Sequence, residues 1–220
     1  MIPHQEDGLI IEAAVTAFIT FFVILDPPGT AAVFAAMTRN VADHHRRHMA
    51  RRATLLAAIM LFAFAFIGEG LLRILGISLP AFRVAGGVLL FLLAADMVFA
   101  RQSGLRSTTP VEDAETAARE DITVFPLAFP LIAGPGAMTS VVLMMGAAAG
   151  DYQRQAVVLA MLAVVMALLL GMLLAAGRVL RVLGLTGAHV VGRVLGIILA
   201  ALAAQFVIDG LKGALPGLVG

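Results

Sequence analysis

The chain contains no cysteine and few charged residues: Asp, Glu, Lys and Arg make up 13% of its 220 residues. Without cysteine there is no disulfide framework, no thiolate nucleophile and no thiolate metal site. The sequence also lacks a Walker loop, a His-Glu-x-x-His pair and a serine nucleophile elbow. We therefore expect no enzyme, no cofactor and no bound metal. A net charge of +1 gives no sign of a nucleic-acid partner.

Apolar residues dominate instead, at 61% of the chain, and the mean hydropathy is +1.01. A soluble domain has about 45–50% apolar and about 25% charged residues. Because a larger core does not explain this excess, the composition predicts an all-α polytopic membrane protein. Residues 1–7 are acidic and lack the basic region of a cleaved signal peptide, so we expect the first helix to stay in the membrane.

Six apolar runs are long enough to cross a bilayer, which takes roughly 20 residues each. They cover about residues 8–37, 53–75, 81–100, 122–149, 155–176 and 187–208. We expect polar loops at 39–52 and 178–186, and a linker at 101–121 with a short helix around 111–119. The predicted organisation is a first three-helix repeat (1–100), a cytoplasmic linker (101–121) and a second repeat (122–220).

The first and fourth runs are too long for one straight span, because 30 residues make a helix of about 45 Å. Each run is interrupted by proline and glycine, at Asp26–Gly29 and at Gly134-Pro135-Gly136. Proline removes a backbone donor, and glycine supplies the freedom that a break requires. We therefore predict broken first and fourth helices, with new helices from Thr30 and Ala137. Such breaks in matching halves are typical of a transporter's substrate site.

The positive residues predict the orientation. Segments 39–52, 101–121 and 178–193 hold eleven of the fifteen Lys and Arg residues. Because positive loops stay in the cytoplasm, we expect both termini to face outward.

An internal repeat is visible at near-constant offsets. Arg83-Val84-Ala85-Gly86 matches Arg193-Val194-Leu195-Gly196 at 110 residues, and Pro28-Gly29 matches Pro135-Gly136 at 107. Three spans per repeat would turn the second copy upside down, so we predict two inverted-topology repeats.

Four stretches carry a resemblance to a known family, in the family's order along the chain. They are Leu25-Asp26-Pro27-Pro28-Gly29, residues 76–90, Pro126 to Ala137, and Gln205 to Gly210. The chain resembles the MarC family of bacterial and archaeal membrane proteins over nearly its whole length. The resemblance implies a six-span, multi-pass protein of the bacterial inner membrane, and the SnatA-like branch implies transport of glycine- and alanine-like amino acids. Asp26 stands where the family usually has asparagine, which leaves substrate and coupling ion (H+ or Na+) open.

The two half-helix N-termini are the expected substrate site, because free N–H groups and the helix dipole favour a carboxylate there. The alternative is a structural kink with hydroxyls bonded to their own helix. The candidate substrate-binding residues are Asp26, Pro27, Pro28, Gly29, Thr30, Gly134, Pro135, Gly136, Thr139 and Ser140.

Other polar residues allow two interpretations each. Asp26 is either an N-cap alone or also the partner of a proton or a substrate ammonium. Asp96 and Gln205 either line the cavity or lie at the membrane interface. We expect Glu69 and Arg73 to pair at i,i+4, and the histidines of 44–48 to contact lipid headgroups.

The sequence thus predicts a secondary transporter of small neutral amino acids that works by alternating access. Its expected partners are the solute, a coupling ion and the lipid bilayer, and homo-oligomerisation stays open. The alternatives are an exporter of ions or other metabolites and a non-transporting scaffold. We expect small residues at Gly86, Gly87, Gly192 and Gly196 to let helices pack closely.

Overall fold

The computed structural model describes residues 3–39, 41–99 and 122–215, and every element in that part of the chain is helical. Five helices are long and apolar enough to cross a membrane, and a pair bent by 53° provides a sixth candidate span. The predicted all-helical polytopic architecture is confirmed. The predicted linker at 101–121, with its short helix, lies outside the described residues.

The first span consists of α1 (Pro3–Leu25) and α2 (Pro27–Met37), which only Asp26 separates. This break is narrower than the predicted Asp26–Gly29. Pro27 and Pro28 fit the first turn of α2, because the first helical positions need no N–H and favour the fixed φ of proline. Residues 8–37 therefore form one candidate span with an internal break.

Two helices begin earlier than predicted. α3 (Asp43–Ile74) includes most of the basic segment expected to be a loop, and Arg46 pairs with Asp43 at 2.8 Å in its first turn. α8 (Ala176–Ala214) includes the expected loop 178–186, with a kink at Gly184 (φ 65°, ψ 175°). Both predicted loops are therefore largely helical, because arginine and alanine favour helix and a helix can continue past the hydrocarbon.

The fourth span is irregular. η1 (Thr123–Ile132) has extended backbone at Phe125 and Phe129, each followed by a cis bond to proline. After Ala133 and Gly134 the chain enters α6 (Pro135–Ala147), two residues before the predicted restart. The predicted interruption of this span is confirmed, and the proline-rich half before it is not a regular helix.

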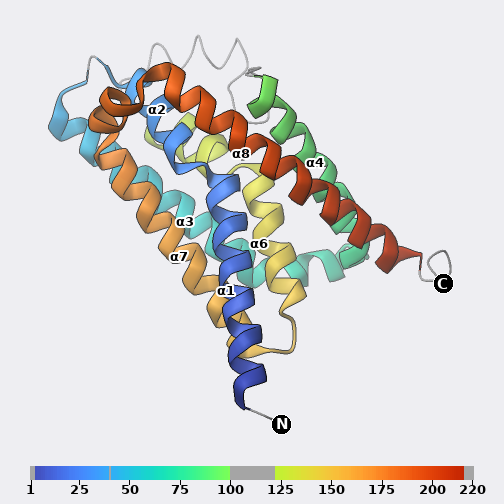
Figure 1. The fold of residues 1–220 in the computed structure, drawn as a ribbon. Coiled ribbons are helices and arrows are strands. Elements are labelled where there is room, and N and C mark those ends of the chain that lie inside the picture. The colour runs from blue at the N-terminus through green and yellow to red at the C-terminus, as the bar shows by residue number, and fades with distance from the viewer. Residues whose placement is uncertain (1–2, 40, 100–121, 216–220) are drawn as a thin grey trace.

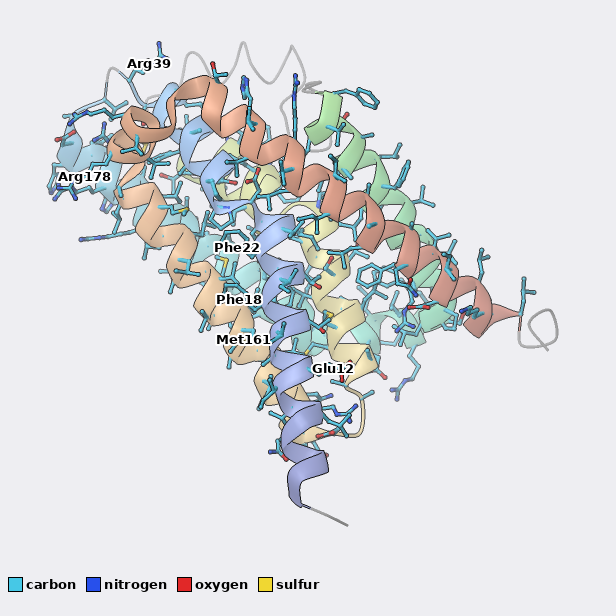
Figure 2. All side chains as sticks on the ribbon, in the orientation of Figure 1. Glu12, Phe18, Phe22, Arg39, Met161 and Arg178 are labelled. Atoms are coloured by element: carbon cyan, nitrogen blue, oxygen red, sulfur yellow. The ribbon has the colours of Figure 1, made fainter. Side chains whose placement is uncertain are left out.

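The remaining helices complete the bundle shown in Figure 1, where α4 (Leu79–Phe99) lies beside α8 and α7 (Tyr152–Leu174) beside α1. Phe18 and Phe22 stack on α1 with ring centroids 5.8 Å apart, on the side toward Met161 of α7 (Figure 2). The α2–α3 and α7–α8 connections lie at one end of the bundle, near the labelled Arg39 and Arg178. The start of α1 and the end of α8 lie away from that end.

Close packing of α4 on α8 depends on glycine. A Cβ on Gly87 would lie 2.8 Å from the carbonyl oxygen of Ala203, and one on Gly196 would lie 2.9 Å from Cβ of Met97. A Cβ on Gly86 would overlap the Cγ2 methyl of Thr139 in α6. The packing role predicted for these three glycines is confirmed. It is wrong for Gly192, because a Cβ added there would have no neighbouring atom within 4 Å.

Candidate functional site

The break in the first span is a single strained residue. Asp26 has φ 43° and ψ 64°, a left-handed conformation that is uncommon for any residue with a side chain. Its Oδ1 accepts a hydrogen bond from the Gly29 N–H at 3.0 Å, and its own N–H donates to the Phe22 carbonyl at 3.0 Å. The side chain is buried at 4% exposure. The predicted N-cap role is confirmed, and the strain marks a position worth a functional hypothesis.

The start of α2 differs from our expectation of a free helix end. Pro27 and Pro28 have no N–H, Gly29 donates to the Asp26 carboxylate, and the Thr30 N–H donates to the Asp26 carbonyl at 2.9 Å. The four first positions of this helix therefore leave no backbone donor for an anion. The reason is the cap itself, because a carboxylate at this position occupies the donor that a substrate carboxylate would need.

The start of α6 is open, in the sense that two of its first amide groups have no hydrogen-bond acceptor among the described residues. Gly134 precedes it without a side-chain cap, and Pro135 has no N–H. The next bonded amide is that of Met138, which donates to the Gly134 carbonyl at 3.0 Å. In the described part of the chain, the amides of Gly136 and Ala137 have no hydrogen-bond partner, and both residues are buried. Two buried free amides at a helix N-terminus favour an anionic group.

Two hydroxyl groups near the breaks are bonded to carbonyls of their own chain. Thr30 Oγ1 donates to the Leu25 carbonyl at 2.9 Å, and Ser140 Oγ donates to the Gly136 carbonyl at 2.9 Å. Thr139 directs its Cγ2 methyl at Gly86 of α4. All three residues are buried. The two hydroxyl bonds agree with the structural alternative, because each satisfies a carbonyl close to a break.

The elements that carry the two breaks touch. α1 packs against α6, and α2 contacts η1, so the interrupted spans adjoin inside the bundle. Large side chains buried in the same core come from α1, α3, η1 and α7: Phe21, Leu61, Leu127, Ile132, Leu162 and Leu169. The breaks are therefore enclosed by protein, as a broken helix in lipid requires.

Asp96 and Gln205 do not come together. The glycine contacts run antiparallel, with Gly87 near Ala203 and Gly196 near Ala94, which places Asp96 and Gln205 toward opposite ends of the α4–α8 pair. Gln205 is exposed, and its Nε2 donates to Asp209 Oδ1 at 2.8 Å. The predicted Glu69–Arg73 pair is confirmed at 3.2 Å on an exposed part of α3.

Glu12 of α1 is a polar residue to which the sequence-based expectations gave no role. The signal was present, because an acid one turn inside an apolar run is by default a functional candidate. In the structure it lines a small pocket at the start of α1, away from both breaks.

The fold and these breaks define a class: a helical, multi-pass membrane protein with two interrupted spans. Within that class the chain belongs to the MarC family, since the description "MarC family integral membrane protein" matches residues 11–215. A UPF0056 membrane protein of Archaeoglobus fulgidus is 36% identical over 89% of this chain and 90% of its own. YhcE of Escherichia coli, also named a UPF0056 membrane protein, is 36% identical over 92% and 93%. No solved structure matches.

Proposed function

We propose that this protein is a secondary transporter that moves small neutral amino acids, such as glycine and alanine, across the bacterial inner membrane. The observation that carries the proposal is the pair of buried breaks in the first and fourth spans, of which the second leaves two free amides. Discontinuous helices at matching positions of two halves form the substrate sites of many secondary transporters. Alternating access would then move one half against the other around these breaks.

Contacts between the halves support an arrangement as inverted repeats. If α1–α2, α3 and α4 correspond to η1–α6, α7 and α8, contacts recur in equivalent pairs. α1 packs on α7 as η1 packs on α3; α2 packs on α8 as α6 packs on α4; and α2 packs on α7 as α6 packs on α3. The α1–α8 contact lacks a counterpart of similar extent. A pseudo-two-fold axis between the halves would produce the recurring pairs.

The glycines of α4 and α8 support the same axis. Gly87 lies against Ala203 of α8, and Gly196 lies against Ala94 of α4. The offset of 110 residues found in the sequence pairs Gly86 with Gly196 and Ala94 with Ala204. Gly87 and Gly196, and likewise Ala94 and Ala203, differ by 109 residues, one less than that offset. Nearly equivalent glycines therefore meet nearly equivalent partners from opposite sides, as inverted copies would.

Within this proposal the substrate carboxylate binds the amides of Gly136 and Ala137. The Asp26 carboxylate, buried at the neighbouring break, is the acidic group that we assign to a substrate ammonium or a coupling proton. The arginine-rich starts of α3 and α8 would lie in the cytoplasm, with both termini outside. The same Asp26 is the observation that favours an exporter of cations or other metabolites as a second candidate.

Transport in proteoliposomes tests the proposal. The purified protein is reconstituted, and uptake of labelled glycine and alanine is measured with an imposed pH gradient, with a sodium gradient and with neither. We expect saturable uptake that one of the two gradients stimulates. Uptake equal to that of protein-free vesicles in all three conditions would exclude these substrates, and a folded protein that moves no tested solute would favour the scaffold alternative.

A further inference from the structure

A second polar feature lies far from the breaks, near the start of α1. There α1, the end of α6 and the start of α7 surround a pocket of about 250 Å³. Its two charged lining residues are Glu12 of α1 and Arg154 of α7, and the rest of the lining is Thr16 and apolar side chains such as Leu9, Ala147 and Val158. Figure 2 shows Glu12 on the part of α1 that lies beside the lower end of α6. One acid and one base therefore line the same small space.

Neither charge is neutralised by the other. Among the described residues, Glu12 takes part in no hydrogen bond and no ion pair. Arg154 pairs through Nε with Asp151 Oδ2 at 3.0 Å, and its two terminal nitrogens have no partner in the described part of the chain. Asp151 in turn holds the start of α7, because its Oδ1 accepts from the amides of Gln153 and Arg154. Asp151 thus positions the guanidinium of Arg154, whose two terminal nitrogens can donate to a ligand.

This arrangement matches a ligand that carries both charges. A guanidinium binds a carboxylate through two parallel hydrogen bonds, and a glutamate accepts from an ammonium. A ligand with one charge alone would leave either the Glu12 carboxylate or the terminal nitrogens of Arg154 without a partner. The space is also small, since pockets for drug-sized ligands start at about 300 Å³. We infer that this pocket is an entry subsite for a zwitterionic amino acid, an inference that rests on the proposed transport function.

The pocket lies at the far end of the two helices that lead to the breaks. Glu12 and Asp26 are separated by 14 positions of α1, or about 21 Å of helix, and Ala147 and Gly134 by 13 positions of α6, or about 20 Å. Thr16 lines the pocket one turn after Glu12, and Thr20 follows at the same spacing and is buried. A line of hydroxyls on α1 therefore runs from the subsite into the bundle, along the contact of α1 with α6.

Cysteine protection tests the subsite without requiring transport. Because the chain has no cysteine, Ala147→Cys introduces a single thiol at an exposed pocket position. Ser78→Cys, in the exposed connection between α3 and α4, is the matched control. Labelling by a charged thiol reagent is measured on the full-length protein in vesicles with L-alanine, propylamine or propionate. The measurement is repeated in Glu12→Gln, Arg154→Gln and Glu69→Gln backgrounds, the last of which changes an acid outside the pocket.

We expect L-alanine to protect Ala147→Cys, and propylamine and propionate to protect it at least about tenfold less well. Glu12→Gln and Arg154→Gln should each raise the half-protecting alanine concentration about tenfold, whereas Glu69→Gln should leave it unchanged. Ser78→Cys should label equally in all conditions. Absence of protection by alanine, or equal protection in all three backgrounds, overturns the subsite. Protection with no transport of alanine in vesicles would keep the subsite and refute the proposed function instead.

Discussion

The interruption at Asp26 keeps its hydrogen bonds within the chain, whereas the interruption at Gly134 leaves the amides of Gly136 and Ala137 unbonded. The first uses an acid in a left-handed conformation to cap the following helix, and the second uses an uncapped glycine and a bend of 53°. Two interruptions that both contain proline and glycine thus give a closed helix end and an open one. Under the proposed function this difference would give the two breaks separate roles, with the Asp26 carboxylate at one and the amides that bind the substrate carboxylate at the other.

Bulky side chains at the two breaks should have the largest effect. In Gly29→Leu the new side chain would start within van der Waals overlap of the Asp26 carboxylate, and in Gly136→Leu it would fill the space against Leu90 and Leu93. We expect each to lower alanine transport at least about 100-fold, a loss of ~2.7 kcal/mol. Gly70→Leu, at an exposed position with open space, is the control and should transport normally. Normal transport by both break variants would place the solute site elsewhere.

Replacing Asp26 tests whether its carboxylate has a role beyond capping α2. Asparagine also caps a helix and tolerates the left-handed conformation, so Asp26→Asn should preserve the fold. We expect transport to fall about tenfold while the melting temperature in detergent stays close to that of the native protein. Asp26→Ala should in addition lower stability by about 1 kcal/mol through loss of the cap. If Asp26→Asn transports at the native rate under every gradient, Asp26 is a cap alone.

Substitution of Gly29 or Gly136 by alanine should affect transport to different extents at the two breaks. A methyl group on Gly29 collides with the Asp26 carboxylate that caps α2, whereas one on Gly136 meets only the ends of Leu90 and Leu93, at 3.0 and 3.2 Å. Leucine side chains can shift by a few tenths of an ångström, and the capping carboxylate cannot without losing its bond to Gly29. We expect about fivefold slower alanine uptake for Gly29→Ala and less than about twofold for Gly136→Ala. If Gly136→Ala slowed alanine uptake more than Gly29→Ala, the description of the Asp26 break as closed and the Gly134 break as open would be contradicted.

Substitutions of the glycines between α4 and α8 compare the helix packing contributed by the two halves of the chain. Gly87→Ala and Gly196→Ala place a methyl against the backbone or Cβ of the facing helix, which has no rotamer with which to adapt. Both should lose about 1–3 kcal/mol of stability, the usual cost of overpacking. Gly192→Ala has open space and should be neutral or gain up to about 1 kcal/mol. Thermal unfolding in detergent measures all three, and clearly unequal losses for the first two would argue against equivalent repeats.

Removal of the hydroxyls should have the smallest effect. Thr30 and Ser140 each donate to a carbonyl of their own span, at 2.9 Å. Such bonds within membrane proteins contribute about 0.6 kcal/mol on average. We expect Thr30→Val and Ser140→Ala to change the KM for alanine less than about twofold. A KM that rises tenfold or more in either variant would show that the hydroxyl binds the solute instead.

Much of the architecture could be predicted from the sequence. Run length predicted the number of spans, and Asp26-Pro27-Pro28-Gly29 and Gly134-Pro135-Gly136 predicted the two interruptions, because proline and glycine act on the backbone locally. The helix starts were predicted less well. The arginines of 39–52 suggested a loop, yet α3 begins at Asp43, since polarity alone does not distinguish a loop from an exposed helical turn.

The amino-acid sequence by itself determined that the chain is a multi-pass helical membrane protein with two broken spans, because hydrophobicity and the absence of a proline donor are properties of single residues and short runs. The tertiary structure decided which break is closed and which is open, which glycines meet a facing helix, and that Glu12 and Arg154 share one pocket. These features depend on hydrogen bonds and on contacts between residues far apart in the chain. Only the folded bundle brings those residues together.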